Sequence, residues 1–172
     1  MDKYVELARK SIEYYFIHKA LMPIPINLPK DMVNNKAGIF VSLHSKDGSL
    51  RGCIGTILPG EKTLANEIIS NAVSAAFYDN RFSPLVQSEL KDLDISVDVL
   101  TEPIAINTPD ELDVKKYGVI VKNKNGQYGV LLPDISGVNS VEQQISIAAQ
   151  KAGIDLEKDK IYLYRFEVIR HH

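Results

Sequence analysis

The chain contains a single cysteine, Cys53, in the stretch SLRGCIGT at residues 49–56. Glycines stand at positions 52 and 55, and Arg51 precedes the thiol by two residues. The thiolate is the reactive form of cysteine, and a neighbouring cation lowers the thiol pKa below its ordinary value of about 8.5. The stretch therefore predicts one of two things. Cys53 is either a nucleophile supported by Arg51 or a small, inert buried residue, which is a common use of free cysteine.

A second stretch with chemical potential is AAFYDNRFSPL at residues 75–85. Arg81 follows the expected end of a helix, where a planar guanidinium could bind a carboxylate or phosphate through two parallel hydrogen bonds. The alternative is that Asp79 and Arg81 form a structural ion pair that fixes the helix end. Ser83 and Pro84 then predict the start of another short helix, because proline is tolerated in a first turn.

Two strands are expected, at residues 38–44 and 49–57. Because side chains alternate between the two faces of a strand, the candidate residues gather on one face of this pair. Pairing Leu43 with Leu50 across the SKDG turn places the aliphatic side chains on one face. That register sets Ser42 opposite Arg51 and Phe40 opposite Cys53, and it brings His44 to the same face. His44 is thus a weak candidate for a Cys–His relay. The glycines leave room for a ligand or another backbone. The candidate binding residues are Arg51, Gly52, Gly55, Thr56, Asp79 and Arg81.

Hydrophobic periodicity predicts the elements that position these residues. Helices are expected at 2–20, from Thr63 to about residue 80, and from Ser140 to about residue 153, with strands also at 94–100 and 161–169. Residues 21–36 are expected to be an irregular connection. Hairpin, loop and helix follow one another at 38–80 and again at 117–153, which suggests a weak internal repeat. The pattern predicts an α+β fold with a mostly antiparallel sheet, flanking helices, and the N-terminal helix packed near the final strand.

Composition limits the functional class. The chain has 172 residues, 45% of them hydrophobic and 24% charged, which suits a single globular domain over residues 1–172. A net charge of −2 disfavours nucleic acid as a partner. One cysteine forms no internal disulfide, which fits a reducing compartment, and the sequence shows neither a signal peptide nor a membrane span. We therefore expect a cytoplasmic protein that does not bind membranes.

Several familiar motifs are missing from the sequence. No paired-cysteine motif, phosphate-binding glycine loop or Gly-x-Ser-x-Gly elbow is present, so neither a metal nor a cofactor is predicted. Asp94 and Asp98 lie on one face of a strand and are interpreted as a solvated strand face. The closing pair His171–His172 could begin an expression tag and is set aside.

Five segments together resemble a known family. They are GIFVSL, LRGCIGT, AAFYDNRFSPL, ISVDVL and GVLLP, in this order along the chain. They are similar to the AMMECR family, for which LRGCIGT at 50–56 is the hallmark, and the resemblance covers nearly the whole chain. It implies an α+β domain with a larger and a smaller lobe, a cleft between them, and a site at the hallmark and residues 79–84. It also implies association with Memo-like or radical S-adenosylmethionine proteins.

Two functions follow as expectations. The first is an enzyme, or a component of one, in which a cleft formed by Cys53, Arg51 and Arg81 binds a small anionic ligand. The second is a non-enzymatic module that binds a ligand or a protein partner and in which Cys53 is structural. The reactivity of the thiol separates them, because a nucleophile requires a pKa well below that of free cysteine.

Overall fold

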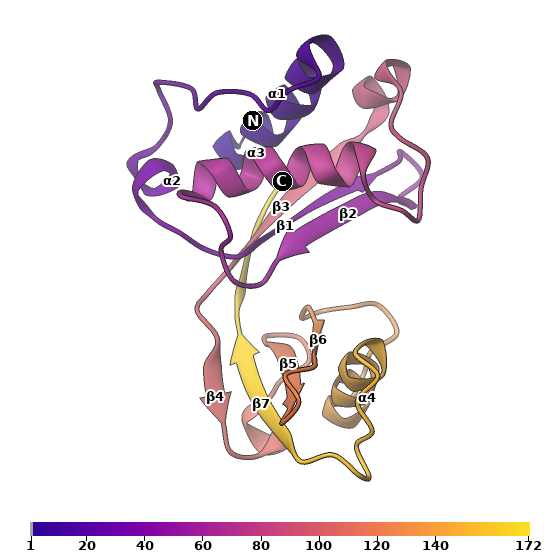
Figure 1. Ribbon diagram of the computed structural model, residues 1–172. Coiled ribbons are helices and arrows are strands. Elements are labelled where there is room, and N and C mark those ends of the chain that lie inside the picture. The colour runs from indigo at the N-terminus through magenta and orange to yellow at the C-terminus, as the bar shows by residue number, and fades with distance from the viewer. Residues whose placement is uncertain (1) are drawn as a thin grey trace. The chain divides into compact units, whose positions relative to one another are not determined.

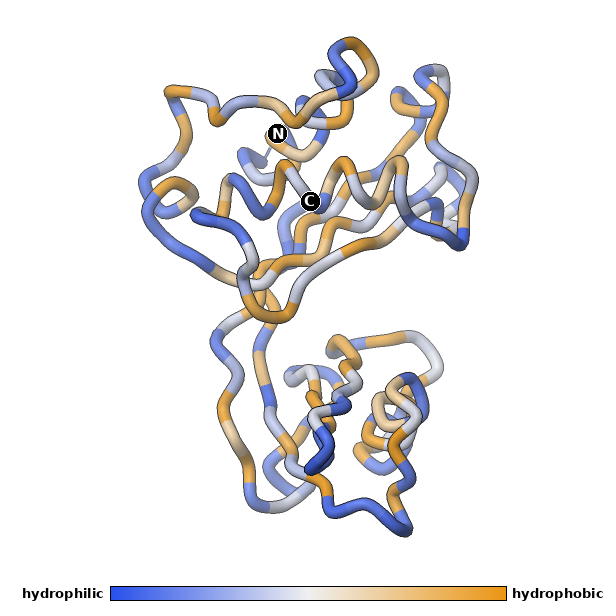
Figure 2. The backbone as a smooth tube through the Cα atoms, viewed as in Figure 1, coloured by the Kyte–Doolittle hydropathy of each residue, from blue (hydrophilic) through white to orange (hydrophobic). Residues whose placement is uncertain are grey.

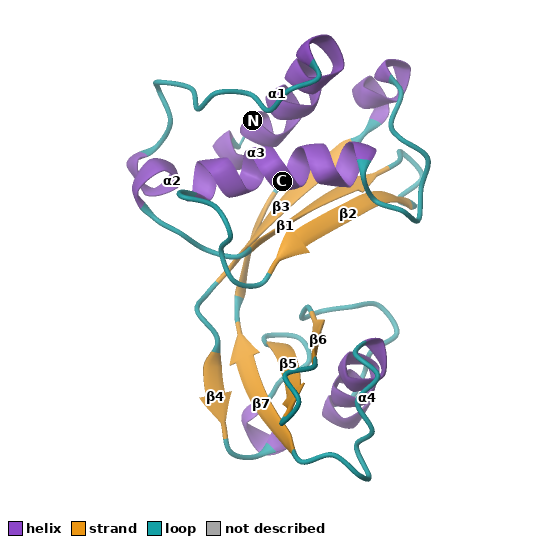
Figure 3. Cartoon of the chain, viewed as in Figure 1, coloured by secondary structure: helices purple, strands orange, loops and turns teal. Residues whose placement is uncertain are grey.

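A computed structural model describes residues 2–172 of the chain and confirms the α+β class. The chain divides into two compact units, each with its own sheet and core. Unit 1 comprises Met1–Leu100 and Ile169–His172, and unit 2 comprises Thr101–Val168. Each sheet has four strands, in the orders β2-β1-β3-β8 and β4-β7-β5-β6. Ribbon and secondary-structure views show helices packed against a sheet in each unit (Figures 1 and 3).

Unit 1 is built on a four-stranded sheet and two long helices. Its elements are α1 (Lys3–His18), α2 (Lys30–Asn34), β1 (Ile39–His44), β2 (Leu50–Thr56), α3 (Leu64–Phe77), the 3-10 helix η1 (Gln87–Asp92), β3 (Asp94–Leu100) and β8 (Val168–His171). Hydrophobic and hydrophilic residues alternate along α1 and α3 (Figure 2). The apolar stripe of α3 is buried, including Ile69 and Ala72, as its helical phase predicts. The Thr63 hydroxyl caps this helix.

The β1–β2 hairpin forms in a register two residues away from the expected one. Cys53 lies opposite Ser42, and Gly52 lies opposite Leu43. The expected pairing was wrong because the turn is longer: Ser45 and Ser49 close it through a backbone hydrogen bond. A bulge between Leu43 and His44 absorbs one residue. A shift of two keeps Cys53 on the same face as Ser42 and Phe40, because side chains alternate along a strand.

Gly52 permits close contact between β2 and α3. A Cβ atom added at Gly52 would lie 2.2 Å from the carbonyl oxygen of Ala75 in α3. Space at this position is therefore filled by protein, not left for a ligand. Gly55 is similarly crowded, because an added Cβ would lie 2.4 Å from a ring atom of Phe40. Both glycines serve packing within unit 1, so of the two expected uses the structure shows the close approach of protein and not of a ligand.

Unit 2 repeats the hairpin–loop–helix pattern. Its elements are β4 (Ile104–Ile106), the 3-10 helix η2 (Pro109–Glu111), β5 (Gly118–Asn123), β6 (Tyr128–Leu131), α4 (Val141–Lys151) and β7 (Ile161–Phe166). In β6, a Cβ added at Gly129 would lie 1.7 Å from the carbonyl oxygen of Ala148 in α4. Gly129 thus corresponds to Gly52 in both its strand position and its helix contact. The shared contact supports the internal repeat as a structural unit.

Three predicted elements differ in the structure. Residues 30–34 of the expected irregular connection form α2. The helix expected at Ser83–Pro84 is instead the 3-10 helix η1, which begins at Gln87 because Val86 remains extended. The expected final strand is divided at Glu167, so β7 belongs to the sheet of unit 2 and β8 to that of unit 1. Alternation alone does not reveal a strand that passes from one sheet to another.

The chain ends meet within unit 1. His171 in β8 stacks on the Tyr4 ring of α1, with centroids 3.8 Å apart. Its Nδ1 atom lies 2.9 Å from a carboxylate oxygen of Asp2, the residue that caps α1. The N-terminal helix therefore contacts β8 at His171, two residues beyond the predicted strand at 161–169, whose main part forms β7 in unit 2. His171 is therefore part of the fold of unit 1.

Candidate functional site

The turn that follows α3 lies against the free edge of β2. The backbone N–H of Cys53 donates to Asp79 Oδ2 (2.9 Å), and the Cys53 carbonyl accepts from Arg81 Nη2 (3.1 Å). Both backbone groups would otherwise be unpaired, because β2 is an edge strand of its sheet. The structure thus brings together two stretches that the sequence separates by more than twenty residues, and the contact is made through the Cys53 backbone.

Asp79 is the centre of this contact. Its side chain is only 3% exposed and pairs with Arg81, whose side chain is 54% exposed. The carboxylate accepts from the backbone N–H and two guanidinium nitrogens of Arg81, in addition to the N–H of Cys53. These hydrogen bonds, chiefly those from the Arg81 side chain, hold the pKa of Asp79 well below its usual range. Asp79 is therefore an ionised structural anchor that also orients Arg81.

Arg51 has a different role from the one expected. It donates to both carboxylate oxygens of Glu89 (2.8 and 3.1 Å) and to the Ser83 carbonyl (3.0 Å). Its side chain is only 14% exposed. The Glu89 carboxylate accepts from Nε and Nη2, and the Ser83 carbonyl accepts from Nη1, so all three guanidinium nitrogens are engaged. Arg51 therefore anchors η1 and the preceding loop to β2, and it is not the cation that acts on the thiol.

The Cys53 thiol is half-buried and accepts a hydrogen bond from the Ser42 hydroxyl, with 3.2 Å between Oγ and Sγ. Burial raises the pKa of Cys53, whereas the Ser42 hydrogen bond and the Arg81 charge act in the opposite direction. Asp98 and Asp79 add to the rise through their negative charges. The net result is a protonated thiol at neutral pH. The expected lowering of the pKa by Arg51 is therefore wrong, because Arg51 is bound elsewhere.

Two other candidates lie apart from the thiol. His44 is at the end of β1, opposite Leu50, and within residues 2–172 no hydrogen bond joins it to Cys53. The Thr56 hydroxyl donates to Glu67, a carboxylate buried in α3 that also accepts from two backbone N–H groups. Thr56 thus fixes the loop after β2. The sequence signal for this contact is Glu67 itself, a charged residue among the apolar residues of α3.

Asp98 was wrongly interpreted as part of a solvated strand face. Its side chain is buried and accepts two hydrogen bonds from Arg170 of β8, at 2.7 and 2.9 Å. The register places Asp98 opposite Phe40, and thus on the same sheet face as Ser42 and Cys53. Alternation identified that face correctly. It did not reveal Arg170, because the partner strand lies seventy residues farther along the chain.

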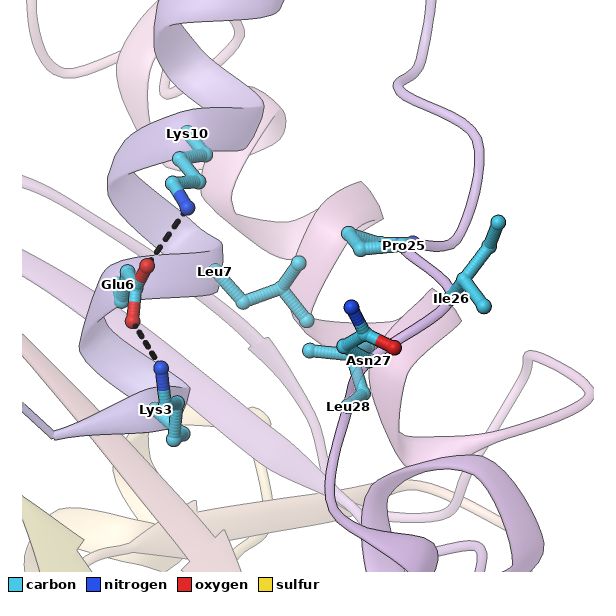
Figure 4. Close-up of a pocket in the computed structure, with 8 residues that line it drawn as sticks. All are labelled: Lys3, Glu6, Leu7, Lys10, Pro25, Ile26, Asn27 and Leu28. Atoms are coloured by element: carbon cyan, nitrogen blue, oxygen red, sulfur yellow. Dashed lines mark hydrogen bonds and ion pairs between the residues drawn. The ribbon is translucent and has the colours of Figure 1, made fainter.

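Two pockets are formed by residues outside the Cys53 region. One, of about 260 Å³, lies between α1 and the loop at Pro25–Leu28, where Lys3 and Lys10 both bond to Glu6 (Figure 4). The other, of about 440 Å³, is in unit 2. Neither is lined by Cys53 or Arg81. Across residues 2–172, no group of three or more His, Cys, Asp or Glu residues is placed to hold a metal ion. In the same range, no helix is long and apolar enough to cross a bilayer.

Comparisons with known proteins agree with this fold and leave the activity open. The family model described as AMMECR1 matches residues 5–171. A protein of Thermotoga maritima is 46% identical over 168 residues, which cover 98% of this chain and 96% of that protein. A protein of Clostridium acetobutylicum is 48% identical over 171 residues, covering 99% of this chain but 36% of its own length. The same unit therefore also resembles part of a longer protein.

A solved structure shows the same architecture. The crystal structure of an uncharacterised protein from Pyrococcus horikoshii matches with a TM-score of 0.87 at 30% sequence identity. The match covers 97% of this chain and 88% of the other. The two proteins thus share the arrangement of helices and antiparallel sheets.

Proposed function

The chain belongs to the AMMECR1 family, and from its site we propose that it is a ligand-binding component of an enzyme system. The names of the matched relatives state no reaction, so the proposal is argued from the site itself. The site is the Cys53 region of unit 1, with Ser42 and Arg81 beside it. Its ligand is a small molecule that carries an anionic group. Cys53 contributes a protonated thiol to the binding surface and is not the nucleophile.

The observation that carries this proposal is the position of Arg81. Its Nη2 atom is held on the Cys53 carbonyl and on Asp79, whereas more than half of the side chain is exposed. Within residues 2–172, its Nη1 atom has no hydrogen-bond partner. A guanidinium that is anchored at one side and open at the other is suited to an oxyanion. Asp79 balances its charge, which favours a weakly charged ligand over a polyanion.

The state of the thiol favours binding over nucleophilic catalysis. A nucleophilic cysteine requires a lowered pKa or an adjacent base. Here burial raises the Cys53 pKa, and the hydrogen-bond partner of the sulfur is a serine hydroxyl, which is no base at neutral pH. The geometry thus supports the non-enzymatic alternative for Cys53 itself. Catalysis would come from a partner or from another domain.

The longer Clostridium protein supports the role of a component. This chain corresponds to about a third of that protein, so a similar unit is joined there to a further segment. We extend the proposal to a protein partner acting with this chain, of the Memo-like or radical S-adenosylmethionine kind that the family resemblance implies. The lone cysteine supports a reducing, cytoplasmic setting for that system.

Protection of Cys53 from alkylation tests the site. Inorganic phosphate or acetate, added at constant ionic strength, should slow the reaction of iodoacetamide with Cys53 in a saturable way. Arg81→Gln should abolish this protection, because the open guanidinium is lost. Lys46→Gln is the matched control: it removes an exposed cation of unit 1 that pairs with Asp92, and it should keep the protection. Equal rates with and without either anion in the unmodified chain would contradict the proposal.

A further inference from the structure

Unit 2 contains a cavity that no sequence motif indicates. Its volume is about 440 Å³, within the range of sites for small molecules. It lies where β7 ends and β4 begins, two strands that are neighbours in the sheet (Figure 3). Its lining residues are Thr101, Glu102, Pro103, Ile104, Tyr117, Arg165, Phe166 and Glu167. All of them belong to unit 2, so the cavity is independent of the Cys53 site.

Arg165 stands out among the five arginines of the sequence. Three of the others have a carboxylate partner: Arg51 pairs with Glu89, Arg81 with Asp79, and Arg170 with Asp98. Arg9 donates to two backbone carbonyls of η1 and the residue after it. Among residues 2–172, Arg165 forms no ion pair, although it lines a cavity. It is therefore the arginine best placed to receive an anion from solution.

The Arg165 guanidinium is also held in place. Its Cζ atom lies 4.4 Å from the centroid of the Tyr117 ring, and Nη1 donates to the Glu111 carbonyl at 2.7 Å. Stacking and one hydrogen bond fix the plane of the fork. No partner within residues 2–172 accepts from Nε or Nη2. A fixed guanidinium with open donors loses little entropy when it binds a carboxylate, which favours affinity.

The remaining lining residues restrict the ligand. Pro103 and Ile104 offer apolar contact, and Ile104 is 60% exposed, whereas the Phe166 side chain is buried. Glu102 and Glu167 also line the cavity, and Glu167 lies 3.6 Å from Lys116. One guanidinium beside two carboxylates disfavours a polyanion such as a phosphate ester. Because Lys116 offsets the charge of Glu167, a ligand with a single carboxylate can still bind the open donors of Arg165.

We propose that this cavity binds a small monocarboxylate with an apolar body. The carboxylate lies on the Nε and Nη2 donors of Arg165, and the apolar part contacts Ile104 and Pro103. This site is additional to the one at Cys53 and does not depend on it. It gives unit 2 a binding activity of its own, for which the sequence alone offered no motif.

Amide NMR spectra of the full chain, titrated with 3-phenylpropionate and with 4-methylpentanoate, test the proposal. At least one of the two should produce saturable shifts at Ile104, Tyr117 and Phe166. The uncharged amide of the bound probe and inorganic phosphate should each bind at least tenfold more weakly. Arg165→Lys keeps the charge but loses the planar fork, and it should weaken binding at least tenfold.

Two further variants keep the test decisive if Arg165→Lys disturbs folding. Ile104→Glu changes an exposed residue, so the fold should persist while the added carboxylate repels the ligand. Lys124→Gln removes an exposed cation from the β5–β6 turn and should leave binding unchanged. The proposal is overturned if neither carboxylate causes saturable shifts, if the amide binds equally well, or if Ile104→Glu binds as tightly as the unmodified chain.

Discussion

Gly52→Ala is expected to lower the free energy of unfolding by about 3 kcal/mol, a large effect for the addition of one methyl group. The new Cβ would lie 2.2 Å from the Ala75 carbonyl oxygen, so β2 and α3 must separate. The obstacle is backbone, which cannot rotate away as a side chain would. Urea unfolding followed by circular dichroism measures the change.

The internal repeat supplies a parallel test and a control. Gly129→Ala should destabilise unit 2 to a similar degree, because its Cβ would lie 1.7 Å from the Ala148 carbonyl oxygen. Gly60→Ala should change stability by less than about 0.5 kcal/mol, because nothing lies within 4 Å of the added atom. If Gly52→Ala were as mild as Gly60→Ala, close strand–helix packing would not be the role of Gly52.

Asp79→Ala should cost about 2–4 kcal/mol, whereas Arg81→Ala should cost less than about 1 kcal/mol. Asp79 is buried and satisfies the N–H groups of Cys53 and Arg81, so its loss leaves the edge of β2 without an acceptor. The Arg81 side chain is largely exposed, so water replaces much of what it loses. Equal losses of stability in the two variants would show that Asp79 stabilises the fold mainly through its ion pair with Arg81, and not through its hydrogen bonds to the edge of β2.

The cost of Asp79→Ala should also depend on pH. Hydrogen bonds from Arg81 lower the pKa of Asp79 in the folded state, and in the unfolded chain it returns to about 3.9. The stabilisation from its charge is therefore complete above about pH 5 and is lost as the pH falls. The difference between Asp79→Ala and the unmodified chain should shrink by about 1 kcal/mol from pH 7 to pH 3. An unchanged difference would contradict the assignment of an ionised Asp79.

Most helices and strands were predicted correctly because apolar periodicity and capping residues lie within the segment that they specify. The apolar stripe of α3 and its Thr63 cap both appear in the sequence, and both are confirmed. The division of the final strand at Glu167 depends on which sheet each half joins, a choice made by distant strands. The register of the hairpin failed for a related reason. A bulge at His44 depends on turn geometry that residue types alone do not specify.

The sheet face that Cys53 and Ser42 share was predicted correctly, but the interactions of the charged residues around it were not. Alternation placed Cys53 and Ser42 on one face, because side-chain direction follows from strand geometry alone. The partners of the charged residues could not be predicted in this way. Glu89, which binds Arg51, and Arg170, which binds Asp98, come from elements far along the chain. Because of these partners, Arg51 does not act on the thiol and Asp98 is not part of a solvated face.

The state of the Cys53 thiol is the central claim, and the pH dependence of its alkylation tests it most directly. The chain has one cysteine, so the mass added by iodoacetamide reports on Cys53 alone. We predict a rate that rises with an apparent pKa above the ordinary value of about 8.5, because burial disfavours the thiolate. Ser42→Ala should raise the pKa further by removing the hydrogen bond to sulfur. An apparent pKa well below 8.5 in the folded chain would contradict the account and make Cys53 a nucleophile.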